Sequence, residues 1–329
     1  MKKIKKKVVV LGGGTGQGNL LRGFKNKDDV DLTAVVAVSD DGGGSGTIRT
    51  EMRMLPPGDI RNCLISLSNM DPTMEKLMNH RFAYGSLKGQ NFGNLFILAL
   101  NEIFGDFQIA IDQVSEMISV RGKVLPASPE MIRLMAVLEN DNVVIGESQI
   151  ARTCLEQSTH VKKIEIIPEK PEATAQVLEH IQEADIIIIG PGSLYTSLLP
   201  NLLIPEIKEA ILKSSAKKVY ICNLMTENGE TDHLDIYQHV ELIQKTLDYH
   251  LQYVVINTSP ISAEIQHNYD REQKTILYPA AEDIRRMNEI GVQSIRGEFA
   301  VETDYGAMMH DSDKVVRTIL KLLQSRRSQ

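Results

Sequence analysis

A short apolar strand that runs directly into a dense group of glycines is the feature that most constrains the fold of this chain. Ten of its 23 glycines lie between Gly12 and Gly46, immediately after the β-branched run Val8–Leu11. Such a run is typical of a strand buried on both faces, as in a parallel sheet. Because glycine loses much conformational entropy on folding, this density indicates a strong demand on the backbone. We infer that the backbone approaches a ligand closely here.

The alternation of patterns along the chain predicts a doubly wound α/β fold. A helix is expected at 19–25 and a second buried strand at 32–38, which complete a βαβ unit. Residues 59–118 are expected to be mostly helical, and 131–139 with 143–148 to form a hairpin or a short helix. Further strands are expected at 161–167, 185–189, 218–224 and 253–257, and further helices at 171–183, 204–214, 235–250 and 313–325.

These elements fit one Rossmann-like, mostly parallel α/β domain over 1–329. A helical insertion is expected at about 56–125. Apart from the helix expected at 313–325, the pattern does not define the C-terminal part 259–329.

Composition narrows the class of protein. The formal net charge of −7 argues against a protein that coats nucleic acid, and no apolar run approaches the roughly 18 residues of a membrane helix. The three cysteines are far apart, and no cysteine or histidine shows the spacing of a structural zinc site. We expect a cytoplasmic protein without nucleic-acid or membrane partners.

The glycine-rich run after the first strand is the first candidate ligand site. Gly12, Gly13, Gly14, Thr15 and Gly16 offer backbone N–H groups beside a helix N-terminus, which favours a phosphate. The run fails the GxGxxG count of dinucleotide sites and lacks the lysine of a Walker A motif. It is therefore an anion site of another type, with a tight turn requiring positive φ as the alternative.

An acidic pair follows the second strand. In a nucleotide-binding βαβ unit an acid at this place takes the ribose hydroxyls, and an aspartate pair beside phosphates can instead hold Mg²⁺. A polar loop without a ligand is the alternative. The candidates here are Ser39, Asp40, Asp41, Gly42 and Gly43.

Four further motifs follow predicted strands or precede predicted helices. Asp59 and the asparagines are helix caps in one interpretation and ligand contacts in the other. The hydroxyl-rich turn after the isoleucine strand resembles a phosphate or sugar cradle. The last motif is also compatible with a polar loop, and Glu227, Glu230 and Asp232 follow it. The candidates are Asp59 and Asn62; Asn91 and Asn94; Gly190, Gly192, Ser193, Tyr195 and Thr196; and Asn223 and Thr226.

In order, these motifs resemble those of the bacterial gluconeogenesis-factor proteins, which share a superfamily with the 2-phospho-L-lactate transferase of coenzyme F420 synthesis. The resemblance covers about 7–257 and includes Leu55–Leu64, Asn91–Leu95, Gly190–Ser197 and Cys222–Thr226. It implies a Rossmann-like fold, a cytoplasmic location and binding of UDP-sugars, above all UDP-N-acetylglucosamine. It also implies a regulator needed for cell shape and wall synthesis on gluconeogenic carbon sources.

The transferase branch implies Mg²⁺ between carboxylates and phosphates, with Asp40 or Asp41 and Asp59 as the metal ligands. The segment after Asp41 and the segment 58–62 follow the regulator pattern instead. The resemblance leaves open a protein partner in amino-sugar or cell-wall synthesis and a homo-oligomer.

The leading hypothesis is a UDP-sugar-binding regulator with no catalytic residue. The diphosphate would lie on Gly12–Gly16 and Gly190–Ser193, ribose or metal on Asp40 or Asp41, and sugar or base on Asn91 and Asn94. Tyr269 and Arg271 are candidates for stacking on uracil. A Mg²⁺-dependent phospho-transferase and an NAD-binding protein are the alternatives.

Overall fold

The central element of the fold is a parallel sheet of seven strands. The computed structural model describes residues 5–304 and 306–323, and the sheet has the order β10-β9-β8-β7-β1-β2-β3. All its neighbouring strands pair in parallel, which confirms the Rossmann-like α/β prediction. The strands are β1 (Lys6–Gly12), β2 (Val30–Val36), β3 (Lys123–Pro126), β7 (Ile186–Ile189), β8 (Lys217–Ile221), β9 (Tyr253–Asn257) and β10 (Gln293–Gly297).

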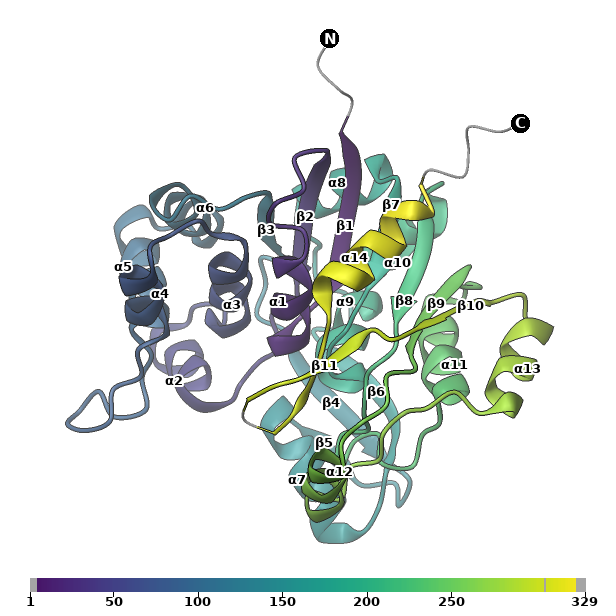
Figure 1. Ribbon diagram of the computed structural model, residues 1–329. Helices are drawn as coiled ribbons and strands as arrows, with labels where there is room; N and C mark the ends of the chain where they lie inside the picture. The colour runs from purple at the N-terminus through teal and green to yellow at the C-terminus, as the bar shows by residue number, and fades with distance from the viewer. Residues whose placement is uncertain (1–4, 305, 324–329) are drawn as a thin grey trace.

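Helices cover both faces of this sheet, and a group of them forms a lobe beside β3 (Figure 1). Within the described ranges, every helix is too short or too polar to cross a bilayer. The lobe contains α2 (Gly43–Met52), α3 (Gly58–Leu67), α4 (Pro72–Asn79), α5 (Phe92–Phe104) and α6 (Phe107–Met117). The other helices are α1 (Gly14–Arg22), α7 (Glu147–Gln157), α8 (Ala175–Glu183), η1 (Leu194–Leu198), α9 (Leu199–Leu203), α10 (Pro205–Lys213), α11 (Ile236–Leu247), α12 (Ala263–Arg271), α13 (Ala281–Glu289) and α14 (Ser312–Lys321).

Two smaller antiparallel sheets complete the fold. The expected hairpin is present as β4 (Arg133–Leu138) and β5 (Val143–Ile145). The strand expected at 161–167, β6 (Val161–Ile167), pairs antiparallel with β4 instead of continuing the parallel alternation. A second hairpin, β11 (Ala300–Glu302) with β12 (Met308–His310), lies in the part that the pattern left undefined. The predicted end of the last helix, at 325, lies outside the described residues.

Alternate residues of the central strands pack into two separate hydrophobic cores, one on each face of the sheet. Val8 and Val10 of β1 pack with α1, α3 and α14, whereas Val9 and Leu11 pack with the helices on the opposite face. The core that contains Val9 and Leu11 continues into the sheet of β4, β5 and β6 through residues such as Leu134 of β4. A strand with a core on each face has no polar position, which is why its sequence is continuously apolar.

The glycine run is a helix and not a loop. Helix α1 begins at Gly14 instead of at Asn19, and α2 likewise begins at Gly43 inside the second glycine cluster. A Cβ on Gly16 would lie 2.8 Å from the carbonyl oxygen of Pro191, so α1 lies against the turn after β7 at a distance that only glycine allows. This tertiary contact outweighs the weak helix propensity of glycine.

Candidate functional site

A pocket of about 360 Å³ lies at the carboxyl ends of β1, β7 and β8. From β1 the chain continues to β2 on one side, while β7 leads to β8 on the other, so the pocket lies at the point where the strand order reverses. Ligands of doubly wound folds bind at this place. The lining residues are Gly13, Gly14, Thr15, Gly16, Asn19, Pro191, Gly192, Ser193, Ser197, Asn223, Leu224, Met225, Glu227, Met308, Met309 and His310.

The N-terminus of α1 forms one wall of this pocket and holds a carboxylate. Gly14 has a φ of +65° at the start of the helix, and its N–H donates to Oδ2 of Asp59 over 2.6 Å. Asp59 lies in the first turn of α3, whose N-cap is Pro57. Asp59 therefore caps α1, not its own helix, and it places negative charge where an anion was expected.

The environment of Asp59 favours the neutral form of its carboxyl group. Burial raises its pKa to about 6, the nearby charge of Asp40 adds to the rise, and the Gly14 N–H and the Arg61 guanidinium oppose it. Because its charge is this costly, Asp59 is ready to accept a proton or a cation.

The turn after β7 forms the opposite wall. Gly190 has a φ of +81°, and Asn223 accepts a hydrogen bond of 3.4 Å from the Gly192 N–H. The Ser193 hydroxyl donates to Oε2 of Glu230 over 2.6 Å and accepts a longer bond from the Thr196 N–H. The turn thus joins the pocket to the acidic segment that follows β8.

The ionisable side chains beside the pocket are mainly carboxyl groups. Burial raises the pKa of both Glu227 and Glu230, whose side chains are hydrogen-bonded to each other. Among the described residues that line the pocket there is no lysine or arginine. His310 is buried, and burial lowers its pKa to about 4, so it supplies no positive charge at neutral pH. The charge of an anionic ligand would therefore meet backbone N–H groups and a carboxyl group among these lining residues, and no cationic side chain.

A second group of acidic side chains comes from the segment between β2 and α2 and from the start of α7. The Ser39 hydroxyl lies 2.9 Å from Oε2 of Glu147, and burial raises the pKa of Glu147, with the charges of Asp40 and Asp59 adding to the rise. Asp41 is directed elsewhere, because its Oδ1 accepts from the Ser148 N–H over 2.8 Å. In the part of the chain that the structure describes, Asp40, Asp41 and Asp59 do not converge within 4.8 Å.

The asparagine motifs are joined by a buried arginine. Arg61 donates to Oδ1 of Asn94 over 2.7 Å and to Oδ1 of Asn62 over 2.8 Å. Asn91 caps α5 by accepting from the Asn94 N–H over 3.1 Å. Asn91 is therefore a helix cap, whereas Asn62 and Asn94 position the Arg61 guanidinium. Asn62 also lines a neighbouring pocket of about 350 Å³, which shares Thr15 with the first.

The structure thus brings together only part of the predicted site. Gly13, Gly14, Thr15, Gly16, Gly192, Ser193 and Asn223 line the 360 Å³ pocket. The other predicted residues lie outside its lining: Gly12, Ser39, Asp40, Asp41, Gly42, Gly43, Asp59, Asn62, Asn91, Asn94, Gly190, Tyr195, Thr196, Thr226, Tyr269 and Arg271.

Tyr269 is the clearest correction. Its ring is 3% exposed inside a small core with Leu224 and Met308, and its hydroxyl accepts from the Met308 N–H over 2.7 Å. A ring enclosed in this way is not available to stack on uracil. Tyr195 is also 3% exposed and belongs to a main core, and Thr226 accepts from the Thr275 N–H. All three residues therefore have structural contacts.

Several pocket residues were missed from the sequence. Ser197 is the last residue of the predicted Gly190–Ser197 motif but was not among its candidates, and Asn19 directly follows the glycine run. The contribution of β12, Met308–His310, comes from the undefined C-terminal part. Outside the pocket lining, Glu147 was expected in a hairpin or a short helix, and it begins α7. No local pattern predicts that these distant segments meet.

Comparison with known proteins places the chain within a family. The model of the 2-phospho-L-lactate transferase CofD family matches residues 8–300. The chain is a member of this family, as the resemblance predicted.

Its similar relatives come from the gluconeogenesis-factor branch. It is 42% identical over 322 residues to the gluconeogenesis factor of Bacillus subtilis, covering 97% of this chain and 99% of that protein. It is 40% identical over 324 residues to the gluconeogenesis factor of Listeria monocytogenes, covering 98% and 97%. A crystal structure of a Bacillus halodurans protein at 42% identity superposes with a TM-score of 0.91, covering 96% and 99%.

Proposed function

We propose that this protein is a UDP-sugar-binding regulator that acts during growth on gluconeogenic carbon sources. The single observation that carries the proposal is the pocket at the strand-order reversal, between Gly13–Gly16 and Gly192–Ser193. The names of its relatives support the role in gluconeogenesis. UDP-N-acetylglucosamine is the expected ligand, and control of cell shape and wall synthesis is the expected consequence.

A divalent cation fits the chemistry of this site. A diphosphate between these two walls would contact Glu227 of the lining, with Asp59 bonded to Gly14 and Glu230 bonded to Ser193 close by. No described lining residue is cationic. Mg²⁺ is a hard cation that prefers carboxylate and phosphate oxygens, and it often bridges the two. Asp59 is the residue best placed to hold it. Asp40 is the second candidate, whereas Asp41 is engaged with α7.

Isothermal titration calorimetry with UDP-N-acetylglucosamine tests the proposal. The titration is run in Mg²⁺ and in EDTA, with UDP-glucose and NAD as competing ligand classes. We expect one saturable site, weaker binding in EDTA, and a loss of affinity in Thr15→Val, which removes an exposed hydroxyl at the pocket. Thr246→Val on α11 is the matched control and is expected to bind normally. No heat at millimolar UDP-sugar would refute the proposal, and preference for NAD would favour a dinucleotide.

A phospho-transferase is the second candidate, because the family model is named for one and acidic side chains flank the pocket. Turnover with a deazaflavin acceptor and a nucleotide-diphospho-lactate donor distinguishes it from the regulator. We expect no turnover. Transfer of the phospholactyl group to the acceptor with release of nucleoside monophosphate, lost when Asp59 is replaced, would assign the enzyme instead.

A further inference from the structure

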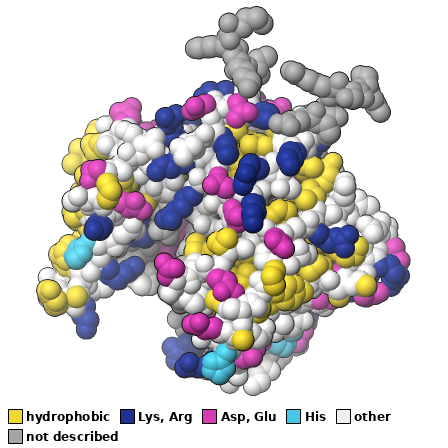
Figure 2. All heavy atoms as spheres, viewed as in Figure 1, with side chains coloured by type: hydrophobic (Ala, Val, Ile, Leu, Met, Phe, Trp, Pro, Cys, Tyr) yellow, Lys and Arg dark blue, Asp and Glu magenta, His cyan; other side chains and the backbone are white. Residues whose placement is uncertain are grey.

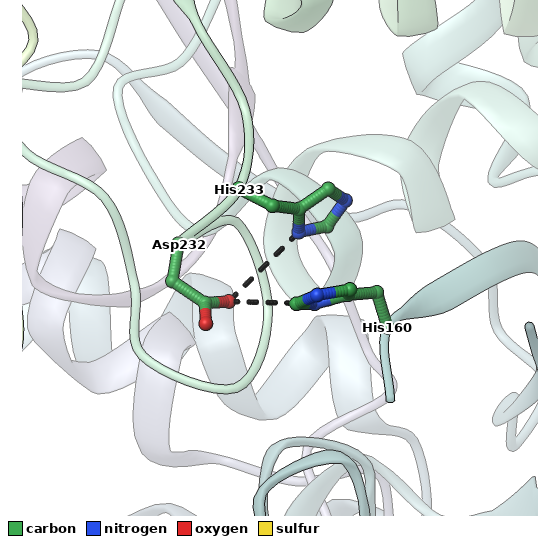
Figure 3. A group of neighbouring side chains, drawn as sticks. All are labelled: His160, Asp232 and His233. Atoms are coloured by element: carbon green, nitrogen blue, oxygen red, sulfur yellow. Dashed lines mark ion pairs between the residues drawn. The ribbon is translucent and has the colours of Figure 1, made fainter. Parts of the chain in front are cut away.

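Three side chains outside the nucleotide pocket converge where the small sheet meets the segment after β8. His160 directly precedes β6, and Asp232 and His233 lie between β8 and α11 (Figure 3). The Nδ1 atom of each histidine is 3.9 Å from Oδ1 of Asp232. One potential ligand atom from each of the three residues lies within 4.8 Å of the other two.

Two of these atoms form an ion pair at 3.9 Å but have no hydrogen-bond partner. His160 Nδ1 and Asp232 Oδ1 are both buried and form no hydrogen bond. Leaving a buried donor or acceptor unpaired costs about 1–3 kcal/mol, so such atoms in a native protein need an explanation. Both point toward the same small space, with His233 on its third side (Figure 3).

The rings of His160 and His233 face each other at close range. Their centroids are 3.9 Å apart with an interplanar angle of 35°. Burial lowers the pKa of His233, and the charge of His160 lowers it further, while Asp232 and Glu139 oppose the shift. One nitrogen of each ring is therefore close enough to Asp232 for the three residues to bind a single ion.

We propose that His160, Asp232 and His233 bind one divalent transition-metal ion of the Zn²⁺ type. Two imidazole nitrogens and one carboxylate oxygen suit Zn²⁺, whereas Mg²⁺ and Ca²⁺ prefer oxygen alone. Tetrahedral ligation would bring the ligand atoms to about 3.4 Å from one another, slightly closer than they now lie. Three protein ligands leave the fourth position to water.

The location gives this ion a defined structural effect. Asp232 lies in the same segment as Glu227 and Glu230, which form the acidic side of the nucleotide pocket. The ion therefore attaches this segment to the start of β6. The proposed zinc site does not depend on the proposed nucleotide ligand, and the experiment that tests it uses no nucleotide.

The test measures zinc binding by the full chain without a histidine tag. Competition against a chromophoric chelator gives the affinity, and elemental analysis after dialysis gives the stoichiometry. We expect one Zn²⁺ per chain, unaffected by excess Mg²⁺. His160→Gln, Asp232→Asn and His233→Gln should each weaken binding by about tenfold or more. His267→Gln and Asp248→Asn change exposed residues outside the group and should leave binding unchanged.

Co²⁺ substitution in the unaltered chain provides a measurement that does not depend on the folding of a variant. Intense visible absorption typical of four-coordinate Co²⁺, displaced by one equivalent of Zn²⁺, is expected. The proposal is overturned if the unaltered chain retains no Zn²⁺ and shows no such spectrum. It is also overturned if the folded triple variant binds Zn²⁺ as tightly as the original.

Discussion

At the scale of single residues, the charge of Asp59 is the property that most affects the site. Its carboxylate is hydrogen-bonded to the first N–H of α1, the position that a phosphate was expected to occupy. Its pKa of about 6 shows that the protein destabilises this charge. The free protein thus keeps a carboxyl group where a ligand or a cation can relieve the cost.

Asp59→Asn should stabilise the protein at pH 7 by about 1–3 kcal/mol, because an amide oxygen still accepts from Gly14 without the buried charge. The folded pKa lies above the unfolded value of 3.8, so the original protein loses stability as the pH rises from about 4 to 6. Urea unfolding at several pH values measures this.

The advantage of the variant should therefore disappear near pH 4. Asp28→Asn, at an exposed ion pair with Arg121, is the control and should change stability little. A variant less stable than the original at pH 7 would contradict the assigned environment of Asp59.

At the scale of elements, the packing of α1 against the turn after β7 forms the pocket. A glycine run after a buried strand indicated a ligand site, and the structure adds a packing reason for the same glycines. The helix boundary was missed because glycine has weak helix propensity, and contacts with a segment 175 residues away are not visible locally.

Gly16→Ala should destabilise the protein by about 1–3 kcal/mol and abolish nucleotide binding, because its Cβ would lie 2.8 Å from the Pro191 carbonyl. Gly18→Ala in the same helix is the matched control. Its nearest neighbour is the Ser66 hydroxyl at 3.1 Å, which can rotate away, so the change should be small. Thermal unfolding and calorimetry compare the two. Equal behaviour of both variants would contradict the packing account.

Elements with strong periodic patterns were predictable, and meetings between distant segments were not. The buried strands β1, β2, β7 and β9 and the capping box of α11 follow directly from local sequence. The antiparallel pairing of β6, the addition of β12 to the pocket and the burial of Tyr269 depend on tertiary contacts. Hydroxyls and asparagines give the same local signal whether they bind a ligand, as proposed for Thr15, or cap a helix, as Asn91 does.

At the scale of the whole molecule, charge is distributed unevenly between surface and pocket. On the face shown in Figure 2, lysine and arginine side chains gather around the upper centre, with a few acidic side chains among them. Lys6, Lys27, Lys314, Arg317 and Lys321 line one hollow together with Asp29 and Glu298. The pocket side, by contrast, gathers acids with raised pKa values around Asp59, Glu147 and Glu230. Folding therefore gathers carboxyl groups whose charged form is costly near the place where the ligand is proposed to bind.

This concentration predicts how stability depends on pH. Burial raises the pKa of Glu230 to about 8, so the folded state holds its proton more tightly than the unfolded state. In EDTA, the free energy of unfolding should therefore decrease as the pH rises from 6.5 to 8.5. The titration of histidines contributes little over this pH range. Melting temperatures should fall by a few degrees over this range, and less in Glu230→Gln. Melting temperatures that rise with pH would contradict the assignment.

The most direct test of the account is a crystal structure of the protein with UDP-N-acetylglucosamine and Mn²⁺ in place of Mg²⁺. We predict density for the diphosphate between Gly13–Gly16 and Gly192–Ser193, with an anomalous peak for the metal between its oxygens and the carboxylate of Asp59. Diphosphate density in the neighbouring pocket beside Asn62, or a diphosphate bound at the predicted place without any metal, would contradict the account.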